Sequence, residues 1–138
     1  MNLIILLQIA GTLHLGLLCA SLLMPGAVGL QTHLATLPVF IRWLFWVYYT
    51  FIGVCLISFG LITFTFAGTL AAGSGLARAL CAFLAVFWTI RLVAATFVFD
   101  VRPYLTNAFW RLGYYATNVV FVFLPVIYAW AAWKGGRP

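Results

Sequence analysis

Carboxylate side chains are almost absent from this sequence, which has one acidic residue, Asp100, among 138. Paired carboxylates serve much of the acid–base chemistry of enzymes, and acids inside the membrane drive many proton and cation pumps. A single acid argues against both kinds of function. Charge of either sign is scarce too, because charged residues make up 6% of the chain, whereas a soluble domain carries roughly 25%. The chain therefore lacks the wetted surface of a soluble domain.

Histidines and catalytic motifs are also few. The histidines are His14 and His33, and the sequence contains no HExxH, no GxSxG and no glycine-rich phosphate loop. Cys19, Cys55 and Cys81 have no metal-ligand spacing, so we expect them to pack as small residues. The net charge of +6 is spread without a basic run. We expect no enzyme activity, no resident metal or cofactor and no nucleic-acid partner.

Long apolar runs are what the sequence does contain, with 67% hydrophobic residues. Each run reaches the roughly 20 residues that a helix needs to cross the hydrocarbon, and a helix satisfies its own backbone hydrogen bonds there. The sequence predicts an all-α polytopic membrane protein, a single domain over 1–138 with four transmembrane helices in a compact bundle. The helices are expected at about 2–24, 40–67, 76–99 and 108–133, with a loop at 68–75.

The residues that flank these runs bear on whether the first run is cleaved and on how the chain is oriented in the membrane. Pro25 should end the first run, and since no Lys or Arg precedes that run we expect it to be retained rather than cleaved as a signal peptide. Basic residues divide three against three between the two membrane sides, so the positive-inside rule does not choose an orientation. We expect the membrane to be the bacterial cytoplasmic membrane, with lipid at the interfaces and other membrane subunits or further copies of the chain as partners.

Aromatic and charged side chains gather at the side that holds the 25–41 and 100–107 connections. Tryptophan and tyrosine anchor helices at the headgroups, so an aromatic belt explains this face, and a pocket entrance or docking face is the alternative. Asp100 could form a structural ion pair with Arg102 or Arg111, or take part in a proton relay. The residues of this face are Arg42, Trp43, Trp46, Asp100, Arg102, Trp110, Arg111 and Tyr114.

Arg91 is the one basic residue placed far inside a span. It precedes Asp100 by nine residues, which corresponds to about 13 Å of helix and hence to a position near the bilayer midplane. The two side chains point to opposite faces of the helix, so Asp100 does not neutralise Arg91 within it. A central arginine costs about 2.5–3.5 kcal/mol on translocon scales and faces a bundle interior or a wet cavity in most membrane proteins.

The same count places one polar side chain of every span at this depth. His14, Thr50 and Asn118 each lie ten residues from the end of their span on the same side, about 15 Å deep. With Arg91 they predict one midplane layer, either a structural hydrogen-bond network or a site for a ligand with acceptor oxygens, such as a quinone carbonyl or a lipid phosphate. His14 also suggests a haem ligand, but the only other histidine lies in a loop.

In general outline the pattern resembles the small four-helix accessory subunits of bacterial respiratory or photosynthetic complexes. It is similar in length to small dimeric exporters, but their first-helix glutamate has no counterpart here. Neither resemblance transfers roles to residues. We expect a non-catalytic accessory or structural subunit of a larger membrane complex. The alternatives are a small oligomeric transporter of an anionic or neutral solute, and a haem-binding anchor through His14.

Overall fold

The computed structural model describes residues 2–99, 103 and 106–135 of the chain, and helices dominate this part. Four long helices have the length and composition of membrane spans, two short helices connect them, and no strand occurs within the described ranges. The predicted all-α fold with four transmembrane helices is confirmed. The helices are α1 (Leu3–Ala27), α2 (Leu30–Ala35), α3 (Val39–Thr65), α4 (Ala67–Ala72), α5 (Gly75–Phe97) and α6 (Ala108–Lys134).

The first span was predicted to end before Pro25. In the structure α1 continues through this proline to Ala27. A proline inside a helix has no N–H, so the carbonyl four residues earlier, that of Ser21, loses its partner within the helix. The hydroxyl of Tyr49 in α3 donates a hydrogen bond to this carbonyl. The neighbouring helix thus supplies the donor that Pro25 lacks, which allows the helix to continue in a membrane.

The segment expected as a loop at 68–75 is also largely helical. After a break at Phe66, α4 turns back on the bundle and buries Ala67 and Leu70, which are 1% and 3% exposed. Gly73 ends the helix with a positive φ of 71°, a conformation that glycine adopts without steric cost. The prediction of a loop was wrong because α4 packs against α1 and α5.

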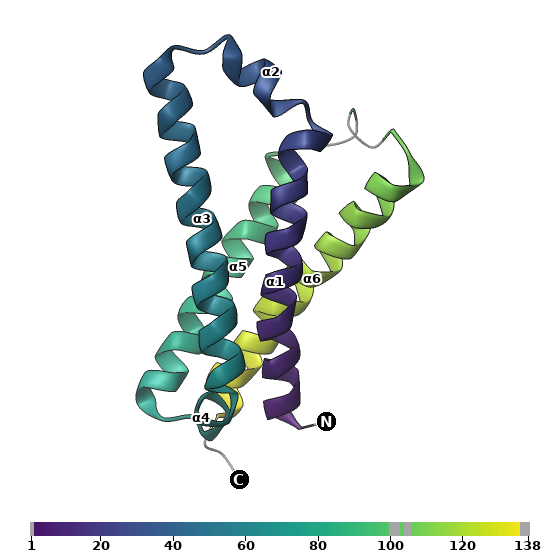
Figure 1. The fold of residues 1–138 in the computed structure, drawn as a ribbon. Helices are drawn as coiled ribbons and strands as arrows, with labels where there is room; N and C mark the ends of the chain where they lie inside the picture. Colours follow the sequence, from purple (N-terminus) through teal and green to yellow (C-terminus); the bar gives the residue numbers. More distant parts are fainter. Residues whose placement is uncertain (1, 100–102, 104–105, 136–138) are drawn as a thin grey trace.

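The four long helices converge at one end and diverge at the other (Figure 1). α1 packs against both α3 and α6, and α5 packs along α6. The chain termini and α4 lie at the end where the helices meet, whereas α2 bridges α1 and α3 at the end where they separate (Figure 1). The bundle is therefore wedge-shaped rather than evenly packed.

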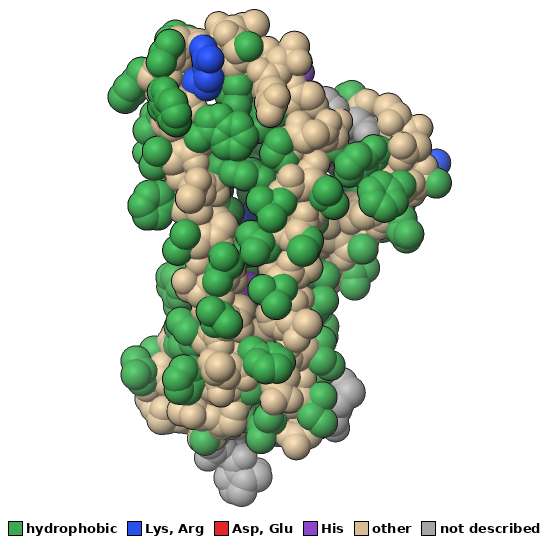
Figure 2. All heavy atoms as spheres, viewed as in Figure 1, with side chains coloured by type: hydrophobic (Ala, Val, Ile, Leu, Met, Phe, Trp, Pro, Cys, Tyr) green, Lys and Arg blue, Asp and Glu red, His purple; other side chains and the backbone are tan. Residues whose placement is uncertain are grey.

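Burial follows this shape closely. The buried residues of the four long helices fall within 6–17 of α1, 56–63 of α3, 77–88 of α5 and 121–131 of α6. We call this region the packed half. The remaining stretches, 18–27, 39–55, 89–97 and 108–120, contain no buried residue and form the open half. Its surface is mostly apolar, and a hollow runs between α3 and α1 (Figure 2). The compactness expected from the sequence is found in the packed half alone.

Two features hold the packed half together, a close contact between α1 and α3 and a row of small residues on α5 that faces the core. α1 and α3 touch at Gly11 and Gly60, where a Cβ on Gly11 would lie 2.8 Å from the backbone nitrogen of Phe64. α5 turns Ala77, Cys81 and Ala85 inward, with exposures of 4%, 0% and 9%. Small residues at four-residue intervals let helix backbones approach, and van der Waals contact is the main attraction between helices in lipid.

The Gly11 contact yields a first prediction. Gly11→Ala should lower the free energy of unfolding by about 1–3 kcal/mol, because the added methyl group overlaps the backbone of α3 and pushes the helices apart. Gly16→Ala is the matched control, since nothing lies within 4 Å of its Cβ position, and it should stabilise α1 by up to about 1 kcal/mol. Unfolding curves in detergent measure both, and equal effects would contradict the close contact.

The Tyr49 hydrogen bond yields a second prediction. Tyr49→Phe should cost about 0.6–1.7 kcal/mol, the range measured for hydrogen bonds between membrane helices. In a Pro25→Ala background the restored N–H can bond to Ser21, so the same substitution should cost less. Tyr48→Phe, at a side chain that is 63% exposed, is the control. Strictly additive effects of Pro25→Ala and Tyr49→Phe would show that the hydroxyl does not replace the missing backbone donor.

Candidate functional site

His14 lies in the centre of α1 and is completely buried. Its Nδ1 is 2.7 Å from the Ala10 carbonyl oxygen, which can only accept, so Nδ1 carries the proton. Its Nε2 is then an acceptor, and the indole Nε1–H of Trp88 in α5 donates to it over 3.2 Å. Both ring nitrogens of His14 are therefore engaged, and the neutral ring links α1 to α5.

A second buried hydrogen bond lies in the same half. The hydroxyls of Thr63 in α3 and Tyr128 in α6 are 2.7 Å apart, and both side chains are completely buried. The ring of Tyr128 meets that of His14 edge-on at 6.2 Å. We call His14, Thr63, Trp88 and Tyr128 the core polar cluster. It draws one side chain from each long helix and leaves no polar atom of these four side chains without a partner.

Arg91 lies on α5 just beyond this cluster, one turn after Trp88, and its side chain is exposed. Its guanidinium carbon is 5.2 Å from the ring centre of Phe121 and 5.6 Å from that of Phe99. Phe99 follows by eight residues, roughly 12 Å of helix rise, so the two side chains extend toward each other along the helix. Among residues 2–99, 103 and 106–135, no acceptor forms a hydrogen bond or ion pair with Arg91.

Thr50 and Asn118 do not join His14 and Arg91. The Thr50 hydroxyl is exposed and donates to the Trp46 carbonyl over 2.9 Å, and the half-buried Asn118 amide donates to the Tyr114 carbonyl over 2.9 Å. Each bond stays within its own helix. The four side chains therefore form no common hydrogen-bonded layer, because equal residue counts predict similar depth but not lateral contact, and the helices diverge sideways where Thr50 and Asn118 lie. Binding of a quinone or lipid stays a prediction.

The expected aromatic face divides into two groups. On α3, Trp46 and Tyr49 meet at 5.6 Å, with Phe45 beside both. On α6, Trp110 meets Phe109 at 5.3 Å and Tyr114 meets Tyr115 at 5.7 Å. These ring contacts stay within each helix. Arg111 is exposed, and Asp100 and Arg102 lie outside the described residues, so the ion pair of Asp100 stays a prediction.

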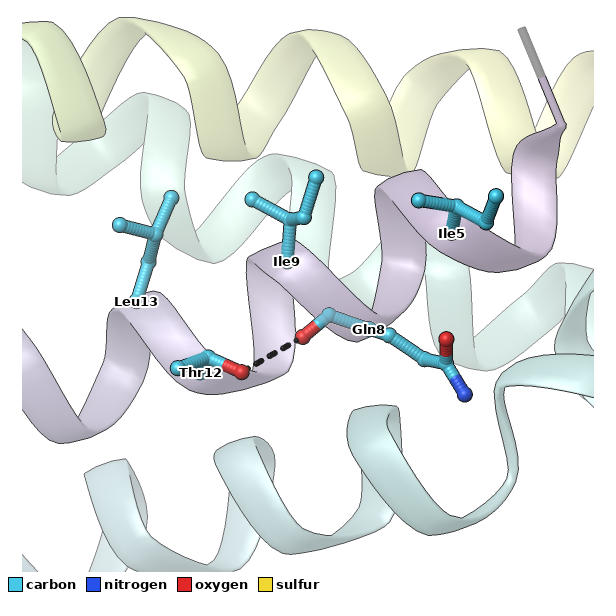
Figure 3. A pocket seen from close by; sticks show the side chains of 5 residues that line it. All are labelled: Ile5, Gln8, Ile9, Thr12 and Leu13. Atoms are coloured by element: carbon cyan, nitrogen blue, oxygen red, sulfur yellow. Dashed lines mark hydrogen bonds between the residues drawn. The ribbon is translucent and has the colours of Figure 1, made fainter.

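Two shallow grooves mark the surface. The first, about 270 Å³, follows the outer side of α1, where Thr12 donates to the Gln8 carbonyl (Figure 3). In this groove Ile5, Ile9 and Leu13 lie beside the Gln8 amide. Its lining suits an acyl chain. The second, about 400 Å³, is lined by Arg42, Trp43 and Trp46 near the start of α3.

The described residues do not fit a haem or metal site. A haem iron needs a free imidazole nitrogen, and the Nε2 of His14 is already bonded to Trp88 inside a filled core. Within the part of the chain that the structure describes, no three His, Cys, Asp or Glu side chains lie close enough to share an ion.

Comparison with known proteins adds no relative, since no protein-family model, no curated protein and no solved structure matches the chain. The fold and its four apolar helices define a small integral membrane protein.

The core polar cluster yields a third prediction. Trp88→Phe keeps a large ring but removes the N–H, which leaves the buried Nε2 of His14 unpaired and should cost about 1–3 kcal/mol of unfolding free energy. Trp130→Phe, at a partly exposed ring of α6, should cost less than half as much. Unfolding in detergent measures both. A haem Soret band in the purified protein would contradict the assignment of His14.

Proposed function

We propose that this protein is a non-catalytic accessory subunit of a larger membrane assembly, and that a partner subunit covers its open half. The exposed guanidinium of Arg91 carries the proposal. It lies within the membrane span α5, three residues past Trp88, the last buried residue of that helix.

The free-energy cost of placing the Arg91 guanidinium inside the membrane supports contact with a partner subunit. A central arginine costs about 2.5–3.5 kcal/mol in a membrane helix. Each aromatic ring beside it contributes about 0.5–2 kcal/mol, which offsets much of that cost but satisfies none of its five N–H donors. Carboxylate or carbonyl oxygens of another subunit would accept these hydrogen bonds. The four side chains of the core polar cluster, by contrast, find their hydrogen-bond partners within the chain.

The shape of the chain supports the same proposal. In the open half, large apolar side chains such as Phe51, Ile90 and Val119 are 63%, 66% and 68% exposed. α3 and α6 diverge there (Figure 1), whereas α1 and α3 stay linked by the hydrogen bond of Tyr49. Helices or lipids from outside must fill this wedge, and small shape-complementary wedges favour protein packing in lipid. Alternatively, the carbonyl of a bound quinone or the phosphate of a lipid would supply the acceptor oxygens for Arg91 in place of a protein.

Transport of an anionic or neutral solute is the second candidate, and it fits the geometry less well. A solute that reaches Arg91 from the open half would meet the buried rings of His14, Trp88 and Phe121 before it could leave past α4. A transporter would have to part these rings in each cycle. The bacterial cytoplasmic membrane, and a respiratory or photosynthetic type of complex, stay our predictions from the resemblance in outline.

Gentle extraction and native mass spectrometry test the proposal. Wild type should carry a stoichiometric second subunit. Arg91→Leu should reduce its recovery about tenfold or more, because losing one partner of a desolvated charged pair costs about 2–5 kcal/mol. The isolated Arg91→Leu protein should unfold no more easily than wild type, since the described residues give this cation within the span ring contacts but no hydrogen-bond acceptor. Arg91→Lys should keep part of the recovery.

Arg78→Leu is the matched control, because Arg78 bonds to Ala132 in the packed half over 3.0 Å and should not affect the partner. Wild type that purifies without any second subunit, or that moves solute in liposomes on its own, would overturn the proposal.

A further inference from the structure

Arg42 lies in the first turn of α3, at the corner where α2 leads into that helix. Its Nη2 is 3.5 Å from the Leu37 carbonyl oxygen, at the long limit of a hydrogen bond. Its Nε is covered and has no partner at all. A guanidinium forms up to five hydrogen bonds, so this one is poorly satisfied within the chain.

The groove of about 400 Å³ lies directly beside this guanidinium, between Arg42, Trp43 and Trp46. Arginine side chains rotate about several single bonds, and the long contact to Leu37 does little to hold Arg42 in place. A small rotation presents the edge formed by Nε and Nη2 to the groove. That edge matches two oxygens of a phosphate, which arginine binds through two parallel hydrogen bonds.

The surroundings identify the source of the phosphate. The site lies at the end of a membrane span, with two indole rings at the level where tryptophan meets lipid headgroups. Trp43 is 67% exposed, and the neighbouring Phe40 is 73% exposed, so acyl chains have an apolar surface to follow away from the groove. None of the residues that the structure describes offers a carboxylate to compete for Arg42.

We propose that the groove of Arg42, Trp43 and Trp46 binds the headgroup phosphate of an anionic phospholipid, with Arg42 holding the phosphate oxygens and the two indoles enclosing the glycerol. This site is separate from Arg91 and lies at the rim of the open half, where the partner of the proposed function would leave the groove open to lipid. Anionic lipid is favoured because the guanidinium repels the cationic end of a zwitterionic headgroup, and because the chain carries a net charge of +6.

Native mass spectrometry of the delipidated full chain, titrated with single lipids, tests the site. Phosphatidylglycerol should bind with a first dissociation constant about fivefold or more below that of phosphatidylcholine. Arg42→Gln should weaken the first phosphatidylglycerol by about tenfold, as expected when a charge-assisted hydrogen-bonded pair is lost. Arg42→Lys should keep the charge and fall between the two. Trp46→Leu should weaken binding without changing the preference for the anionic lipid.

Arg111→Gln is the matched control, because Arg111 is an exposed arginine of the open half outside this groove, and it should change binding by less than about twofold. The lipid-free melting temperature of Arg42→Gln should equal that of wild type, since Arg42 has so few contacts. Equal losses in Arg42→Gln and Arg111→Gln would overturn the proposal by showing unspecific charge attraction. Binding of glycerol 3-phosphate as tight as that of the lipid would overturn it in favour of a soluble anion.

Discussion

The hydrogen bond from Trp88 to His14 lies close to the level at which the core of this bundle ends. Leu17 of α1 and Leu56 of α3 are buried about one turn farther on. The bond uses the last free nitrogen of a buried histidine, ties α1 to α5 and places a large ring against Phe121 of α6. On one side of it the helices interdigitate through small residues, and on the other they diverge. Burying a histidine with an unpaired nitrogen is costly, so this bond is needed for the packed half to enclose His14.

The two halves differ in whether the chain itself supplies hydrogen-bond partners for its polar side chains. The buried polar side chains of the packed half pair inside the chain, as the hydroxyls of Thr63 and Tyr128 do. In the open half, Arg91 inside α5 and Arg42 at the start of α3 keep guanidinium donors that the described chain does not satisfy, as does the exposed Arg111. Lipid tails accept no hydrogen bonds, so the acceptors must come from headgroups or from another protein. These arginines therefore indicate where the molecule meets its surroundings.

The sequence predicted the four spans to within a few residues, because their hydropathy is strong and continuous. It also predicted that Cys81 packs as a small residue, and this side chain is fully buried on α5. It did not predict the partners of His14, since one Trp among six carries no mark of burial and the facing of each helix depends on its rotation against the others. The continuation through Pro25 was missed for a similar reason, because the compensating hydroxyl of Tyr49 comes from another helix.

Photo-crosslinking in native membranes tests most directly whether another protein covers the open half. A benzoylphenylalanine at Tyr114, a half-buried ring of the open half, would react with whatever lies within the wedge. The same probe at Trp130, an exposed ring of the packed half, would react with whatever contacts the outer surface of that half. Our account predicts a cross-linked product with the added mass of a second protein from Tyr114 and mainly lipid adducts from Trp130. Lipid adducts alone from both positions would contradict it.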